Sequence, residues 1–199
     1  MMTNRPLRID NMREPGRNVS FLALAAATAL SASQFVSAQK SAPGKETAPD
    51  VPDAIAVPAG VQPVLFVHAA GSQIYTCKAG ADGKFAWALK APEADLKDRN
   101  DKVVGRHSAG PAWKLNDGSE LTGKMAAQVS SLDEDSIPWL LVNVVSNSGK
   151  GQLAKVTTIQ RVHTHGGKPA PTDVCDEAHK DSETKSPYTA DYYFFAPVQ

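Results

Sequence analysis

Two histidines, His163 and His165, stand two positions apart in a segment with the alternation of a β-strand. Alternate residues of a strand project to the same face, so the two imidazoles would point the same way. That spacing suits two ligands of zinc or copper, with a third ligand from another histidine or an acid. The pair is therefore a candidate metal site. The alternative is a polar strand end beside Gly166 and Gly167.

His107 and Ser108 form a second candidate, because a histidine can be the base that activates a serine nucleophile. Adjacent strand residues point to opposite faces, so this pair needs a bend, which Gly110-Pro111 could supply. Trp113 and Asp117 add an aromatic wall and a carboxylate to the same stretch. We therefore take His107, Trp113 and Asp117 as candidate residues of a pocket for a small molecule or a glycan. The alternative is that the histidine satisfies backbone groups at a corner and the tryptophan belongs to the core.

The stretch Gly118–Lys124 nearly spells a phosphate-binding loop, but Met125 stands where a hydroxyl residue would bind magnesium. The chain also lacks a Gly-x-Gly-x-x-Gly fingerprint, a Gly-x-Ser-x-Gly elbow and a His-Glu-x-x-His motif. We therefore expect a non-catalytic ligand-binding or envelope-associated protein. The alternative is a secreted hydrolytic or metal-dependent enzyme that uses His107 with Asp117, or His163 with His165.

Residues 1–38 have the order of a secretory signal peptide: arginines, an apolar run over Phe21–Leu30, and small residues that end at Ala38. The apolar run is roughly half of the about 20 residues that a membrane-spanning helix needs. The residues before Met12 are polar, which favours Met12 as the true start. We expect a periplasmic or secreted protein without a transmembrane segment in the mature chain.

Residues 39–57 hold several prolines and few large apolar side chains, which predicts a flexible tether before a domain over residues 58–199. The whole chain has 21 basic and 21 acidic residues, and loss of the first 38 residues leaves a net charge of about −2. A nucleic-acid partner would favour a basic face. We therefore expect a small molecule, a glycan or an envelope protein as the partner, and no cofactor beyond the zinc or copper considered above.

Cys77 and Cys175 are the two cysteines of the chain. In an oxidising compartment such a pair most simply forms a disulfide. It would close a loop of nearly one hundred residues and stabilise the fold by roughly 4 to 5 kcal/mol through loop-closure entropy. The alternatives are two free buried thiols, or one thiol that acts as a nucleophile or ligand.

The region after residue 60 is a succession of short β-patterned segments separated by Gly, Pro and Asn-Asp clusters. Val64–Val67 and Gln73–Cys77 flank Ala69–Ser72, which predicts a hairpin with its turn at those four residues. The alternating segment Lys84–Lys90 is expected to end before Pro92.

The second half continues the β pattern. The nearly continuous apolar run Ile137–Val145 predicts a central strand that is covered on both faces. Leu153–His165 and Tyr188–Phe195 predict two more strands on either side of a long loop over residues 168–186. The fold class that follows is all-β: a single-domain antiparallel sandwich or barrel with a long C-terminal loop and one disulfide.

A hairpin centred on Asn116–Gly118 can be predicted to the level of register. A three-residue loop with its glycine in the left-handed conformation pairs Trp113 with Leu121, and Lys114 with Glu120. A two-residue Asp-Gly turn would instead set an acid opposite a leucine. The three-residue loop is therefore expected.

Several segments resemble the domain of unknown function family 3455: Gly71–Cys77, Trp87, Ala91–Leu96, His107–Trp113, Asp117–Ser119, Ile137–Leu141, Ile159–Val162, Thr164–Gly167, Cys175 and Tyr188–Phe194. The resemblance covers roughly residues 58 to 197. It implies a secreted or envelope protein of bacterial or fungal type. It brings no activity, substrate or catalytic residue with it.

Overall fold

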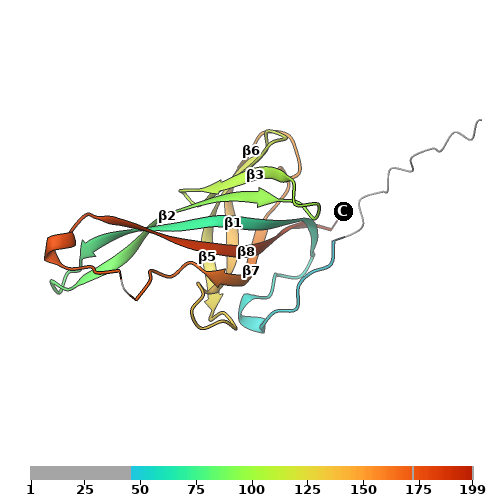
Figure 1. Cartoon of the computed structure of the whole chain (residues 1–199). Coiled ribbons are helices and arrows are strands. Elements are labelled where there is room, and N and C mark those ends of the chain that lie inside the picture. Colours follow the sequence, from blue (N-terminus) through green and yellow to red (C-terminus); the bar gives the residue numbers. More distant parts are fainter. Residues whose placement is uncertain (1–45, 172, 199) are drawn as a thin grey trace, which may run out of the picture. The chain divides into compact units, whose positions relative to one another are not determined.

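The computed structural model describes residues 46–171 and 173–198. Its strands follow in order: β1 (Val61–Ala79), β2 (Phe85–Lys97), β3 (Val103–Ser108), β4 (Ala112–Leu115), β5 (Glu120–Val129), β6 (Trp139–Ser148), β7 (Thr158–Gly166) and β8 (Glu183–Pro197). Each strand pairs antiparallel with the next, and β8 pairs with β1 to close a barrel (Figure 1). The all-β prediction is confirmed, and of the two architectures considered the barrel is the one present.

Two single-turn 3-10 helices, η1 (Asp53–Ile55) and η2 (Glu177–His179), are the helical elements of the described part. No helix in that part is long and apolar enough to cross a membrane.

Strands β1, β2 and β8 are longer than the wall of the barrel. Strand β2 pairs with β3 only from its residue Ala94 onward, and β8 pairs with β7 only from its residue Tyr188 onward. Residues 73–79, 85–92 and 183–187 therefore continue beyond the barrel as a three-stranded arm (Figure 1).

The end of the barrel opposite the arm is filled by apolar side chains. Leu153 and Val156 of the β6–β7 loop are 0% and 1% exposed and join the core with Leu121, Ile159 and Phe194. The strand predicted over Leu153–His165 therefore begins later, at Thr158, because its first apolar residues close the end of the barrel.

The hairpin register predicted around Asn116–Gly118 is confirmed. Trp113 pairs with Leu121, and Lys114 pairs with Glu120. Gly118 has a φ of 85°, the left-handed conformation that the three-residue loop requires.

The turn predicted at Ala69–Ser72 is wrong, because β1 runs through these residues without a break. Gly71 is extended and paired on both sides, with Ala94 of β2 and Tyr188 of β8. A Cβ at this position would lie 2.1 Å from Glu93 O. The glycine therefore permits a close approach of two strands rather than a turn.

Pro92 does not end its strand either. β2 continues to Lys97, and the register skips Lys90, which is the extra residue of a β-bulge. Pro92 pairs with Gln73 on one side, and its other edge lies beyond the pairs that β3 forms. A proline is tolerated there because no second ladder needs its missing N–H.

The two-faced burial predicted for Ile137–Val145 holds for the first half of the run only. Val142 packs into the barrel core, and Trp139 lies in a separate cluster with Ile55. Val145 is 67% exposed. A closed barrel has no central strand, so the apolar outer face of β6 needs cover from elsewhere in the chain.

That cover comes from the N-terminal segment, where a tether was predicted over residues 39–57. In the described part, Ile55 is fully buried against Trp139 and Val162, and its carbonyl accepts a hydrogen bond from Gln160 Nε2 (2.7 Å). The residues around η1 are therefore packed on the outer face of the barrel. Residues 39–45 and the signal peptide predicted over 1–38 lie outside the described residues.

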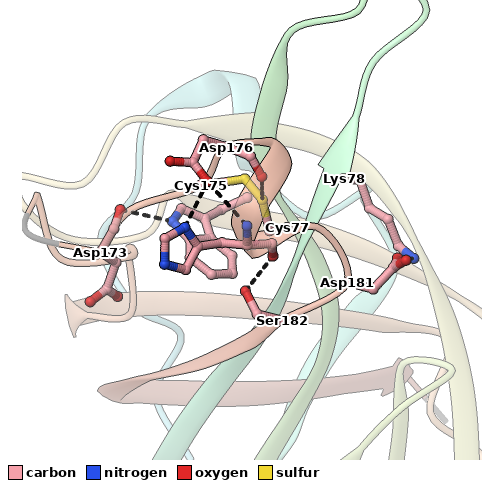
Figure 2. The surroundings of a disulfide bond; sticks show 9 residues. Cys77, Lys78, Asp173, Cys175, Asp176, Asp181 and Ser182 are labelled. Carbon is pink, nitrogen blue, oxygen red and sulfur yellow. Dashed lines mark hydrogen bonds and ion pairs between the residues drawn. A yellow bond between two sulfur atoms is a disulfide. The ribbon is translucent and has the colours of Figure 1, made fainter.

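Cys77 and Cys175 form the predicted disulfide, with their Cα atoms 5.4 Å apart (Figure 2). The backbone of Cys77 also forms two hydrogen bonds with the β7–β8 loop, from its N–H to Ser182 O and from Asp181 N–H to its carbonyl. Trp87 Nε1 donates to Asp173 O (3.1 Å) beside the disulfide. The long loop is thus fastened to the arm.

Candidate functional site

A cavity of about 510 Å³ lies at the end of the barrel from which the arm extends. The barrel strands contribute His107, Trp113, Val142, Arg161 and Tyr192 to its lining, and the base of the arm contributes Gln73. The volume falls within the about 300–1,000 Å³ of small-molecule pockets, and eight strands give a barrel wide enough to hold one small ligand.

Aromatic rings form one wall of the cavity. His107 and Trp113 are cross-strand partners on β3 and β4, and their rings stack with centroids 4.3 Å apart. The Tyr192 ring meets both edge-on, at 5.4 Å from His107 and 5.7 Å from Trp113. Such a wall would pack against an apolar or planar ligand.

His107 is neutral in this wall. It is 3% exposed, and its Nδ1 lies 2.8 Å from Ala112 O, so Nδ1 carries the hydrogen and Nε2 is the acceptor. Burial lowers the pKa of His107 to about 4, and the positive charge of Arg161 acts in the same direction. The imidazole is therefore a hydrogen-bonding group at neutral pH and not a cation.

Arg161 brings a buried positive charge to the cavity. It is 8% exposed, and its Nη2 donates to Pro138 O (2.8 Å), while its Nε has no hydrogen-bond partner in the described part of the chain. Its cross-strand partner on β8 is Tyr192. Burial raises the pKa of the Tyr192 hydroxyl, and the charge of Arg161 opposes that rise.

Further polar atoms of the lining are buried without a hydrogen-bond partner in the part of the chain that the structure describes. They are the amide nitrogen and oxygen of Gln73, the indole Nε1 of Trp113 and the hydroxyl of Tyr192. A buried polar group without a hydrogen bond costs about 1–3 kcal/mol. A group of such atoms around one cavity is typical of a site that a polar ligand completes.

The rim of the cavity is amphipathic. Leu89 and Met125 are 58% and 53% exposed, and a lysine stands next to each of them. Lys90 forms an ion pair with Glu183 (2.5 Å) of the arm. Exposed apolar side chains at the entrance would help an apolar ligand to enter.

Of the three predicted pocket residues, the structure brings His107 and Trp113 together and places Asp117 elsewhere. Asp117 lies in the β4–β5 turn, at the opposite end of the barrel, and its carboxylate accepts hydrogen bonds from Ser119 and Gln152. Partial burial would raise the pKa of Asp117, but these hydrogen bonds together hold it below its ordinary value. Asp117 therefore joins the hairpin to the β6–β7 loop.

His163 and His165 are exposed and face different acids. His163 Nδ1 lies 3.0 Å from Asp191 Oδ2, and His165 Nδ1 lies 3.7 Å from Asp133 Oδ2. His163 has a φ of 48°, and the register with β8 shifts at this point, so the regular alternation assumed from the sequence is interrupted. In residues 46–171 and 173–198, no group of three or more His, Cys, Asp or Glu side chains is arranged to hold a metal ion.

His68 is a further histidine next to Asp191. Its Nδ1 lies 2.8 Å from Asp191 Oδ1, so a single carboxylate links His68 of β1 to His163 of β7. The three side chains form a bridge across β8 on the wall of the barrel.

Sequence reasoning missed Gln73, Arg161 and Tyr192 as site residues. All three stand in segments that carry the family resemblance, within Gly71–Cys77, Ile159–Val162 and Tyr188–Phe194. Arg161 also gives a physical signal, because a cation in the middle of a buried strand normally needs a partner.

Comparison with known proteins adds one finding. The family described as protein of unknown function (DUF3455) matches residues 58–196. No curated protein and no solved structure matches the chain. The match spans the barrel from before β1 to Ala196 near the end of β8, so it includes every lining residue of the cavity. The chain belongs to the DUF3455 family of proteins.

Proposed function

We propose that this protein is a non-catalytic binding protein that holds a small molecule inside its barrel. The observation that carries the proposal is the cavity itself, with one aromatic wall and several buried polar atoms that lack partners. Small-molecule sites combine these two features: an apolar wall supplies affinity, and a few polar groups fix the orientation.

The geometry favours binding over hydrolysis. His107 would need a nucleophile or a second acid–base group within hydrogen-bond reach. In the described part of the chain the lining of the cavity holds no serine, threonine, cysteine, aspartate or glutamate, and Asp117 belongs to the other end of the barrel. The lysines of the lining lie at the rim, and burial raises the pKa of the Tyr192 hydroxyl. The stacked His107 is therefore better suited to contact a ligand than to catalyse its conversion.

Export to the periplasm or the cell exterior is part of the same proposal. It is supported by the order of residues 1–38, which is typical of a signal peptide, and by the Cys77–Cys175 disulfide. Disulfides persist in oxidising compartments. A carrier or sensor of small molecules outside the cytoplasm fits both features.

A neutral fluorescent probe tests the proposal. N-phenyl-1-naphthylamine should bind the wild-type protein, with a rise in probe fluorescence. Ala91→Trp, which adds a large ring to the lining of the cavity, should weaken this binding by about tenfold or more.

Ala88→Trp is the matched control. Ala88 is an exposed residue of the same strand and is not part of the lining, so this variant should bind the probe like the wild type. Absence of probe binding, or an equal loss in the two tryptophan variants, would contradict binding inside the barrel.

A further inference from the structure

We infer that the ligand of the cavity carries a carboxylate, bound by Arg161, on a compact apolar body. This inference rests on the proposed function, because it names the class of ligand for the same cavity.

The charge of Arg161 is the first reason. A guanidinium stays protonated, and a charged side chain is almost never fully buried unless it is paired. Arg161 is 8% exposed, yet its described hydrogen bond goes to a neutral carbonyl, Pro138 O. Within residues 46–171 and 173–198, no aspartate or glutamate lines the cavity. An anion is therefore what the cavity lacks.

The balance of donors and acceptors is the second reason. The unpartnered buried atoms of the lining include N–H donors of Arg161, Gln73 and Trp113, together with the Tyr192 hydroxyl. The matching acceptors are fewer: the Gln73 oxygen, the unprotonated Nε2 of His107 and the Tyr192 hydroxyl, which can accept as well as donate. A carboxylate only accepts hydrogen bonds and has about four lone-pair sites, so it complements a lining that is rich in donors.

The shape of the guanidinium favours a carboxylate in particular. Its Nε and Nη2 lie on one edge, and such an edge binds a carboxylate through two parallel hydrogen bonds. Nε has no hydrogen-bond partner among the described residues, and Nη2 carries a second N–H beyond the one that it donates to Pro138 O. The aromatic wall of His107 and Trp113 would then contact the apolar body of the ligand.

Two isosteric competitors test the inference on the full-length, disulfide-intact protein at neutral pH. 1-Naphthaleneacetic acid and 1-naphthaleneacetamide share a ring system and differ in charge. Each is titrated against bound N-phenyl-1-naphthylamine. The acid should displace the probe at a concentration lower by about tenfold or more, because only the acid pairs with the guanidinium.

Variants locate the source of that preference. Arg161→Met should bring the acid and the amide to within about threefold of each other, and Arg161→Lys, which keeps the charge without the planar fork, should give an intermediate preference. The double variant Lys90→Gln/Lys124→Gln removes the two rim cations and should lower the preference for the acid by less than Arg161→Met does. A preference that depends on the rim lysines and not on Arg161 would overturn the inference.

The outcomes separate this inference from the proposed function. If the probe binds and Ala91→Trp weakens it, but the acid shows no advantage over the amide, the carboxylate is wrong and the binding cavity stands. Inorganic phosphate and acetate can be compared as competitors of 1-naphthaleneacetic acid. If phosphate displaces the acid at a lower concentration than acetate does, the assignment of a carboxylate is also wrong. If the probe does not bind, the proposed function fails and the inference fails with it. The wild-type comparison decides the matter even if Arg161→Met does not fold.

Discussion

The imidazole of His107 and the indole of Trp113 lie almost parallel, 15° apart, as opposite residues of two adjacent strands. The Gly110-Pro111 turn between these strands brings Ala112 O to within 2.8 Å of His107 Nδ1 and so fixes the ring of the histidine. One short hairpin therefore builds the aromatic wall of the cavity. Arg161 and Tyr192 reach the same space from strands that lie much later in the chain.

Burial of His107 makes the stability of the fold depend on pH. The pKa of His107 is lowered to about 4 by burial, and Arg161 adds to this effect. In the unfolded chain the pKa is about 6.5, so the unfolded state binds more protons between these two values. The contribution of His107 to stability is therefore complete above about pH 6.5. Up to about 3 kcal/mol of it is lost as the pH falls towards 4.

The test is urea unfolding of the wild type and His107→Asn between pH 7 and pH 4. Asparagine can still donate to Ala112 O but does not titrate, so the variant should lose less stability over this interval. His165→Asn, at an exposed histidine, is the matched control and should follow the wild-type curve. Identical slopes for wild type and His107→Asn would show that the buried ring does not set the pH dependence.

Local features of the chain were predictable, whereas long-range ones, apart from the Cys77–Cys175 disulfide, were not. The register of Trp113 with Leu121 depends on a single turn and on the pairing of apolar with apolar residues, which neighbouring residues specify. Ala69–Ser72 was mistaken for a turn because small residues and a glycine suit both a loop and a close strand crossing. Only the position of Glu93 in the folded barrel distinguishes the two.

The candidate site was predicted in part for the same reason. His107 and Trp113 lie six residues apart and face each other across one hairpin, so a single stretch of sequence pointed to both. Gln73, Arg161 and Tyr192 converge with them only because the barrel closes between β1 and β8. A residue spacing in one strand gives no information about that closure.

Asp117 and Gly151 are predicted to be energetically coupled. A Cβ on Gly151 would lie 2.4 Å from Asp117 Oδ2, so Gly151→Ala should displace the carboxylate from its bonds to Ser119 and Gln152. We expect a loss of about 1–3 kcal/mol in the free energy of unfolding. In an Asp117→Ala background the same substitution should cost less than about 1 kcal/mol, because the clashing group is gone. Equal costs in both backgrounds, measured by urea unfolding, would contradict this contact.

The disulfide should contribute to stability without shaping the cavity. Cys77→Ser/Cys175→Ser opens a loop with a sequence separation of 98 residues, and the expected loss is about 4 to 5 kcal/mol from loop-closure entropy. Intact mass should show the native protein lighter than its reduced form by two hydrogen atoms. Below its lowered melting temperature the variant should still bind N-phenyl-1-naphthylamine, since neither cysteine lines the cavity. Two titratable thiols in the native protein would disprove the bond.

The N-terminal segment is predicted to stabilise the barrel from outside. Ile55 is fully buried against Trp139 and Val162, so Ile55→Ala should destabilise the protein by about 2–5 kcal/mol through lost burial and the cavity left behind. Leu132→Ala removes a side chain that is 89% exposed and should change stability by no more than about 0.5 kcal/mol. If residues around η1 were a free tether, the two variants would unfold at the same urea concentration. A clear separation between them would instead show that the folded unit begins before the residue 58 expected from composition, because the outer face of β6 needs Ile55 as its cover.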